Sequence, residues 1–161
     1  MKLLERSPVD RPWVAKPVSL VAASGIFVAG CAAPGVSTQV VISVDAPKAI
    51  GPYSQAIKAG NLLFLSAQGP IDPKTNQINT GSIEEQTKQV LDNLNAVLAA
   101  GGMTMQNVVS TTVYLKDLND FAKMNAVYEG YFKERPPARA TVQVAGLPRN
   151  ALVGIAAVAS K

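Results

Sequence analysis

Cys31 is the only cysteine in this 161-residue chain, and small residues lead up to it, since the preceding segment is Val28-Ala29-Gly30. A thiol in this setting is a candidate for acylation, with the chain cut just before the cysteine. The mature protein would then begin at Cys31, tethered by lipid. A single cysteine also means that no disulfide can form within the chain, so a folded domain must be stabilised by burial alone.

The residues ahead of Cys31 have the composition of a secretory signal peptide. Residues 18–30 form a 13-residue stretch without a charge, which is shorter than the roughly 18 residues of a membrane-spanning helix. The small residues before the cysteine resemble the lipobox of bacterial lipoproteins. Upstream of the apolar stretch the segment is net positive, with four basic residues against two acidic ones: Lys2, Arg6, Arg11 and Lys16 against Glu5 and Asp10.

We therefore expect a signal peptide over residues 1–30, a lipidated linker over 31–37 and one folded domain over 38–161. The protein would be a membrane-anchored lipoprotein on the periplasmic side. Ala32, rather than aspartate, follows the cysteine, which favours the outer membrane in a Gram-negative host. The competing interpretation, in which residues 18–30 form a core helix, is weakened by Ser24 and Gly25 in the middle of the stretch.

The remaining composition disfavours several function classes. The chain has no histidine, which argues against His-based acid–base catalysis, Ser–His or Cys–His nucleophile pairs and zinc sites. The formal charge is +4 for the whole chain but +2 from Cys31 onward, where 11 basic and 9 acidic residues are scattered. No run of Lys or Arg alternates with aromatic residues, so we expect no nucleic-acid partner. We also expect no metal.

Hydrophobic periodicity predicts two helices. A capping box formed by Ser82 and Glu85 starts the first, and Gly101-Gly102 ends it. Asp117 or Asn119 caps the second, which stops before Pro136-Pro137. The apolar stripe of the second helix has the spacing of a core face and comprises Phe121, Met124, Tyr128, Tyr131 and Phe132.

The predicted strands cover residues 38–44, 61–68, 108–115, 139–145 and 151–159. The last strand is apolar on both faces, whereas two helices cover only one face of a small sheet. We therefore expect self-association, which is the economical way to bury the other face of the sheet. In the strand over 139–145, we expect the apolar even-numbered positions to face the core and the polar odd-numbered ones to face away: Ala140, Val142 and Val144 against Arg139, Thr141 and Gln143.

Several segments, taken together and in order, resemble the Rid (YjgF) family of reactive-intermediate deaminases. They are 45–55 (DAPKAIGPYSQ), 66–68 (SAQ), 72–75 (DPKT), 113–121 (VYLKDLNDF) and 137–139 (PAR). The resemblance implies a chorismate-mutase-like α+β fold, with a mixed sheet and two helices on one face. It further implies a homotrimer with a small-acid site in each subunit interface. The reaction it implies is hydrolysis of 2-imino or enamine acids, such as 2-aminoacrylate, to 2-keto acids and ammonia without a cofactor.

The resemblance also assigns roles to individual residues. Arg139 matches the substrate arginine, whose planar fork suits bidentate binding of a carboxylate. Tyr53 matches a tyrosine lining the pocket, and Ser66 and Ala67 match a strand segment beside the substrate. Thr141 matches a wall position and, with Arg139, is the candidate catalytic residue. Outside the motif context, Arg139 would be a solvated charge and Thr141 an ordinary strand threonine.

The sequence departs from the family on its last strand. Family deaminases carry a glutamate there that activates the attacking water, and the alignment places Ala156 at that position. Gly154, two residues earlier on the same face, is acidic in many relatives. A positioned general base contributes on the order of 10² to 10⁴ in rate, so this chain lacks a sizeable catalytic contribution.

Two interpretations therefore stay open. In the first, the protein is an extracytoplasmic imine deaminase whose water is held by backbone carbonyls or by Thr141. In the second, it is a catalytically weak trimer that binds a small carboxylate or serves as a membrane-tethered interaction module, because Ala156 replaces the glutamate. A ribonuclease activity, attributed to some relatives, has no support in the charge pattern.

Overall fold

The computed structural model describes residues 35–161. The predicted signal peptide over 1–30 and the lipidation site Cys31 lie outside the described residues. The described chain forms a six-stranded sheet in the order β1-β2-β3-β6-β4-β5, in which only the β4–β5 pair is parallel. The strands are β1 (Thr38–Val41), β2 (Ala56–Ala59), β3 (Leu62–Gln68), β4 (Val108–Leu115), β5 (Ala138–Gln143) and β6 (Val153–Ser160).

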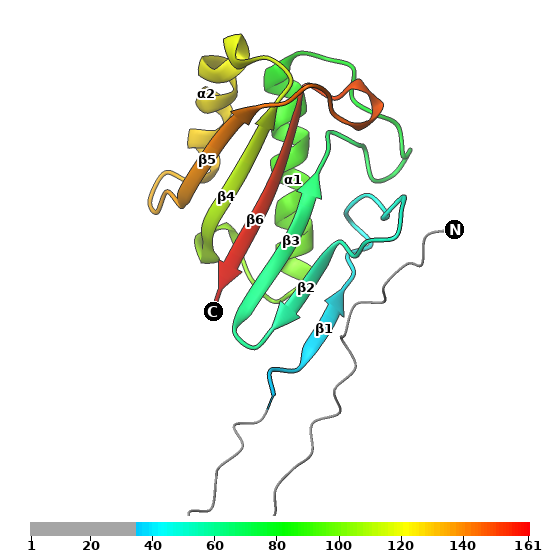
Figure 1. Ribbon diagram of the computed structural model, residues 1–161, viewed down its shortest axis with the longest axis vertical. Helices are drawn as coiled ribbons and strands as arrows, with labels where there is room; N and C mark the ends of the chain where they lie inside the picture. Colours follow the sequence, from blue (N-terminus) through cyan, green and yellow to red (C-terminus); the bar gives the residue numbers. More distant parts are fainter. Residues whose placement is uncertain (1–34) are drawn as a thin grey trace, which may run out of the picture. The chain divides into compact units, whose positions relative to one another are not determined.

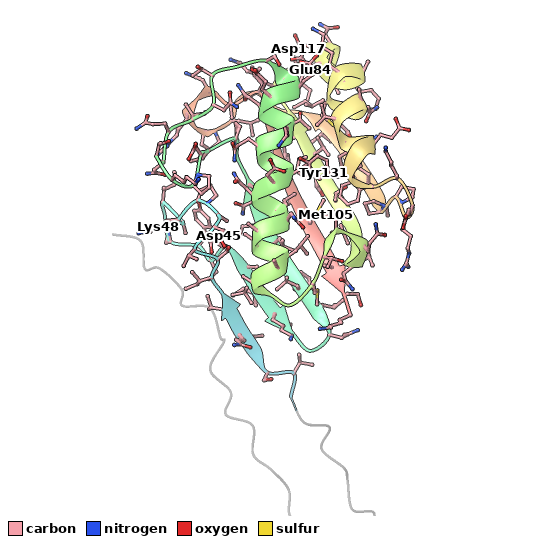
Figure 2. The ribbon with its side chains drawn as sticks, turned by 180° about the vertical axis from the view of Figure 1, so that it is seen from behind. Asp45, Lys48, Glu84, Met105, Asp117 and Tyr131 are labelled. Atoms are coloured by element: carbon pink, nitrogen blue, oxygen red, sulfur yellow. The ribbon has the colours of Figure 1, made fainter. Side chains whose placement is uncertain are left out.

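Two helices, α1 (Ile83–Ala100) and α2 (Phe121–Tyr131), cover the same face of the sheet (Figures 1 and 2). The core lies between them and the central strands, and its fully buried side chains include Leu63, Leu91, Leu94, Val113 and Ile155. The expected α+β fold with a mixed sheet and both helices on one face is therefore confirmed. No helix within residues 35–161 has the length and apolar character needed to cross a membrane.

Helix α1 begins and ends where the sequence predicts. The Ser82 hydroxyl accepts a hydrogen bond from the Glu85 amide (3.3 Å), and the Glu85 carboxylate accepts one from the Ser82 amide (2.8 Å), so the predicted capping box is present. The helix ends at Gly101, where a Cβ atom would lie 2.6 Å from the Cδ2 atom of Leu63. A side chain at this position would force the buried Leu63 side chain to shift, so glycine suits this close approach of the helix end to β3.

The second helix begins through a short 3₁₀ turn, Leu118–Asp120. Of the two predicted caps, Asp117 accepts a hydrogen bond from the Asn119 amide (2.9 Å) and so caps this turn rather than α2 itself. The predicted apolar stripe is only partly a core face. Met124, Tyr128 and Phe132 are buried, whereas Phe121 is exposed and Tyr131 is half-buried.

The sequence analysis missed strand β2 and made β1 too long. The β2–β3 hairpin turns at Gly60-Asn61, and Gly60 has a φ of 60°. Residues 42–44 leave β1 because the side chain of Gln55 takes over hydrogen bonds that a strand would make. It accepts from the Ser43 amide (2.7 Å) and donates to the Pro47 carbonyl (2.8 Å), and this holds the loop after β1 in place.

The predicted orientation of β5 is wrong. Arg139 pairs with Thr111 and Thr141 with Val113, and both partners are buried beneath the helices. The polar side of β5 therefore faces the helix layer, while Val142 lies on the opposite face and is 43% exposed. The alternation of polar and apolar residues shows that a strand has two different faces, but it does not show which face the helices cover. At this sheet edge the guanidinium of Arg139 lies over the rings of Tyr128 and Phe121 on α2.

The sheet face opposite the helices, toward which Figure 1 looks, is open within residues 35–161. Val40, Phe64 and Val142 project from it and are 43–52% exposed. A contiguous apolar sheet face of this kind is typical of a surface that packs against another chain.

Candidate active site

Arg139 is held at the β5 edge by two aromatic rings of α2. Its guanidinium carbon lies 4.6 Å from the ring centroid of Tyr128 and 5.7 Å from that of Phe121. The Tyr128 hydroxyl is in turn hydrogen-bonded to the Thr111 hydroxyl at 2.7 Å. Burial raises the pKa of Tyr128, although this hydrogen bond and the positive charge of Arg139 act in the opposite direction.

Arg139 lines an open cleft between α2 and β5 with a volume of about 570 Å³, which we call the arginine cleft; Asn125, Tyr128, Phe132 and Pro137 also line it. Within the described chain the only ion pair joins Lys88 and Asp92, so no carboxylate lies within 4.0 Å of the Arg139 guanidinium. The Oδ1 atom of Asn125 is buried without a hydrogen-bond partner. The cleft thus presents an unpaired cation beside an unsatisfied polar group.

Thr141 lies two residues after Arg139 on the same face of β5, opposite Val113. Its Oγ1 atom is buried and has no hydrogen-bond partner. Buried hydroxyls are nearly always paired, so an orphan hydroxyl two residues from Arg139 points to a ligand or a water molecule. Its predicted catalytic role stays a prediction.

Ser66 and Ala67 lie at a β-bulge in the middle of the sheet. The β3–β6 register pairs Leu65 with Ala157 and next Gln68 with Ile155. Two residues of β3, Ser66 and Ala67, therefore lie opposite the single residue Ala156 of β6. Bulges of this kind interrupt the hydrogen-bond ladder and recur beside active sites, where they re-aim a side chain or end the strand pairing.

The bulge forms one wall of a second cavity, of about 340 Å³, which we call the bulge pocket; it is lined among others by Tyr53, Ser66, Ala67, Leu147 and Gly154. The sequence-predicted residues Tyr53, Ser66 and Ala67 therefore come together. The Tyr53 hydroxyl accepts a weak hydrogen bond from the Ile50 amide (3.4 Å), and the Ser66 hydroxyl donates to the Ser54 carbonyl (2.7 Å).

One copy of the chain does not join the two halves of the candidate site. The bulge pocket lies on β3, whereas Arg139 and Thr141 lie on β5, and strands β6 and β4 separate them. With neighbouring strands about 4.8 Å apart, the two halves are roughly 14 Å from each other. A ligand as small as a 2-keto acid cannot span that distance.

The bulge pocket also lacks the acids that the family pattern led us to look for. Gly154 lines it, and Ala156 lies on the same strand face, opposite the bulge. Within residues 35–161 no group of three or more Asp, Glu, His or Cys side chains could hold a metal ion. The described site therefore consists of Arg139 with hydroxyl and amide groups, the charged side chains of Glu129 and Lys133 that also line the arginine cleft, and a largely apolar pocket.

Asn125 is a site residue that the sequence analysis missed. It lies on α2 one turn before Tyr128, and its carbonyl oxygen is unsatisfied next to the arginine cleft. A polar residue on a helix is usually solvated, so the sequence contains only a weak signal. That signal is its position immediately after Met124 in the buried stripe, where a polar side chain lies at the edge of the core.

The fold and the two half-sites define an α+β domain with a cationic cleft, and comparison with known proteins places it in a family. The model of the family described as endoribonuclease L-PSP matches residues 43–161. The chain belongs to this family, as its Rid (YjgF) motifs indicate. It is 56% identical over 123 residues to a RutC family protein of Pyrococcus horikoshii, which covers 76% of this chain and 98% of the relative.

Two further relatives are informative about chemistry. The chain is 46% identical over 121 residues to the mouse protein named 2-iminobutanoate/2-iminopropanoate deaminase, covering 75% of this chain and 90% of the relative. Its fold matches the crystal structure of E. coli TdcF with bound serine at a TM-score of 0.73 and 36% identity, over 76% of this chain and 98% of that one.

Proposed function

We propose that this protein hydrolyses reactive 2-imino acids, including the imine form of 2-aminoacrylate, to 2-keto acids and ammonia. The observation that carries the proposal is the unpaired guanidinium of Arg139, held by Tyr128 and Phe121 in an open cleft. A guanidinium so placed binds a carboxylate through two parallel hydrogen bonds. The name of the mouse relative supports the choice of a 2-imino acid as the carboxylate.

The complete site requires two copies of the chain. Arg139 and the hydroxyl of Thr141 of one copy would supply the carboxylate-binding half, and the bulge pocket of the next copy would supply the other half. The open apolar sheet face with Val40, Phe64 and Val142 supports such an assembly, since burying it removes apolar surface from water. A homotrimer closes the arrangement with three equivalent sites.

The reaction adds water to the carbon of the C=N bond and then breaks the C–N bond, so that ammonia leaves and a carbonyl group remains. Arg139 fixes the substrate by its carboxylate and so orients the imine carbon. No carboxylate is available at position 156 to take the proton from water. The water is held instead by the backbone of Ala67 at the bulge, or by the hydroxyl of Thr141, which has no partner within residues 35–161.

A second candidate function follows from Ala156. Without a general base, the same trimer would bind a small carboxylate and turn it over slowly, acting as a binding or interaction module. The crystal structure of the relative TdcF with bound serine supports recognition of a small amino or keto acid in this fold. RNA cleavage is the weaker candidate, because the chain has no histidine and its basic residues are scattered.

We also propose that the domain works at an extracytoplasmic membrane surface through a lipid on Cys31. The support is the sequence alone: a net-positive segment, an uncharged stretch over 18–30 and Ala29-Gly30 before the cysteine. Mass spectrometry of protein extracted from membranes tests this. A lipid-modified N-terminal Cys31 is expected, and a polypeptide that retains Met1 would contradict the proposal.

The activity is tested by measuring keto-acid release from imino acids that an amino-acid oxidase generates continuously. We expect purified protein to accelerate release above the spontaneous rate, and Arg139→Ala to abolish the acceleration. If wild type binds pyruvate but does not accelerate hydrolysis, the binding-module function is correct. If wild type neither binds pyruvate nor accelerates release, both functions are wrong.

A further inference from the structure

The bulge pocket is apolar, although it lies beside the residues expected to meet the substrate. Its wall is built largely from aliphatic side chains contributed by four separate segments of the chain: Ile50, Ile71, Ile78, Leu147 and Val153. Its volume of about 340 Å³ falls within the range of small-molecule pockets, roughly 300–1,000 Å³. A methyl group, the side chain of 2-iminopropanoate, fills only a small part of that space.

Three polar side chains on the pocket wall each make a hydrogen bond within the chain. The Ser66 hydroxyl donates to the Ser54 carbonyl (2.7 Å), and the Gln68 amide donates to the Ser66 carbonyl (3.1 Å). Arg149 donates to the carbonyl of Asn76 (2.9 Å), which ties together the two loops that border the pocket. What the pocket offers to a ligand is therefore mainly apolar surface.

Gly154 leaves one side of the pocket open. A Cβ atom at this position would lie 3.6 Å from the Gln68 carbonyl oxygen and 3.7 Å from the Cδ2 atom of Leu147, both ordinary van der Waals contacts. The backbone thus accepts a side chain, and a long one would extend into the cavity. Ala156, the next residue on the same face, adds only a methyl group opposite the bulge.

From this geometry we infer that the bulge pocket receives the substrate's side chain and selects 2-imino acids with branched aliphatic or aromatic side chains over 2-iminopropanoate. The inference rests on the proposed function, because Arg139 of the adjacent copy must hold the carboxylate. Each methylene group buried in such a pocket favours the larger substrate, and one or two of them give a discrimination of about tenfold or more.

The test compares three 2-keto acids that differ only in the side chain: pyruvate, 4-methyl-2-oxopentanoate and phenylpyruvate. Their Kd values are measured by calorimetry with the full-length protein, and kcat/KM values are measured for the imines of alanine, leucine and phenylalanine. Gly154→Leu fills the pocket. Gly130→Leu is the matched control, because it adds the same side chain on α2 where no atom lies within 4 Å of the new Cβ.

We expect wild type and Gly130→Leu to prefer the two larger acids by about tenfold or more. Gly154→Leu should remove that preference while changing pyruvate affinity by less than about threefold. If Gly154→Leu does not fold, Gly154→Ala serves, and a partial loss of preference is expected. Equal affinity for all three acids in wild type, or an equal loss for all three in Gly154→Leu, would overturn the inference and leave the proposed function intact. Failure to bind any 2-keto acid would instead remove the proposed function and, with it, this inference.

Discussion

Arg139 lies over the face of Tyr128, with its guanidinium carbon 4.6 Å from the ring centroid, and no carboxylate of residues 35–161 lies within 4.0 Å of it. An aromatic ring orients the guanidinium without neutralising it, because a cation–π contact leaves the outward N–H groups free. The arrangement places an oriented cation without a carboxylate partner on an edge strand, as the proposed carboxylate site requires.

Two replacements of Tyr128 distinguish the role of its aromatic ring from the role of its hydroxyl group. Tyr128→Phe keeps the ring but leaves the Thr111 hydroxyl without its partner, so it should cost about 1–3 kcal/mol of stability with little loss of 2-keto acid affinity. Tyr128→Leu should also weaken affinity, because Arg139 loses its platform. Urea unfolding and calorimetry on both variants measure the two effects. Equal affinity in Leu and Phe variants would show that the ring does not orient Arg139.

Arg139 itself should tolerate no conservative replacement. Arg139→Ala should weaken binding of 2-keto acids by about 2–5 kcal/mol, as expected for loss of a desolvated, charge-assisted contact. Arg139→Lys should recover only a small part of this, since an ammonium group does not form the bidentate pair. Calorimetry with pyruvate checks both variants. Wild-type affinity in Arg139→Ala would show that the carboxylate binds elsewhere, for example at Arg149 on the rim of the bulge pocket.

Ala156→Glu should restore the missing general base. The position lies opposite the bulge on the open face of β6, so a carboxylate there should raise imine hydrolysis by on the order of 10² to 10⁴ if only the base is lacking. Val158→Glu is the matched control, because Val158 lies on the same face two residues further along and pairs with Phe64. A gain in both variants, or in neither, would show that the role assigned to position 156 is wrong.

Tyr131 predicts a specific loss of stability at high pH. Burial, together with the hydrogen bond to Asp92 and the charge of that carboxylate, raises its pKa above the ordinary value of about 10. The folded state therefore keeps a proton that the unfolded state loses, so stability is fully present below about pH 10 and falls as pH rises through the folded pKa. Tyr131→Phe should therefore reduce the drop in the free energy of unfolding between about pH 9 and about 12, as measured by urea unfolding. An unchanged slope would contradict this.

Local sequence signals predicted the parts of the fold that are determined locally. The capping box of Ser82 and Glu85 and the glycine pair at 101–102 mark the two ends of α1, and strand Val108–Leu115 has the predicted bounds. Strand β2 was missed because Ala56–Ala59 is short and alanine-rich, although Gly60-Asn61 is a recognised hairpin signal.

The parts that depend on tertiary structure could not be predicted in the same way. Polar and apolar residues alternate along β5, which shows that the strand has two different faces. Only the position of α2 decides which face is covered, and the sequence analysis therefore assigned Val142 to the wrong side. The bulge that sets Ser66 and Ala67 opposite Ala156 depends on pairing between strands 90 residues apart. Asn125 becomes a site residue only because β5 and α2 form a cleft around it.

The central claim, that two copies of the chain share one site, is tested most directly by mixing two variants. Arg139→Ala removes the carboxylate-binding half, and Ala67→Trp blocks the bulge pocket, so neither should bind 2-keto acids alone. Hybrids are formed by co-refolding full-length chains, with refolded wild type as the control. Random assembly of equal amounts into a closed ring leaves one site in four with both halves intact, so calorimetry should recover about a quarter of the wild-type sites. Mass spectrometry that detects hybrids alongside calorimetry that detects no sites would contradict a shared site.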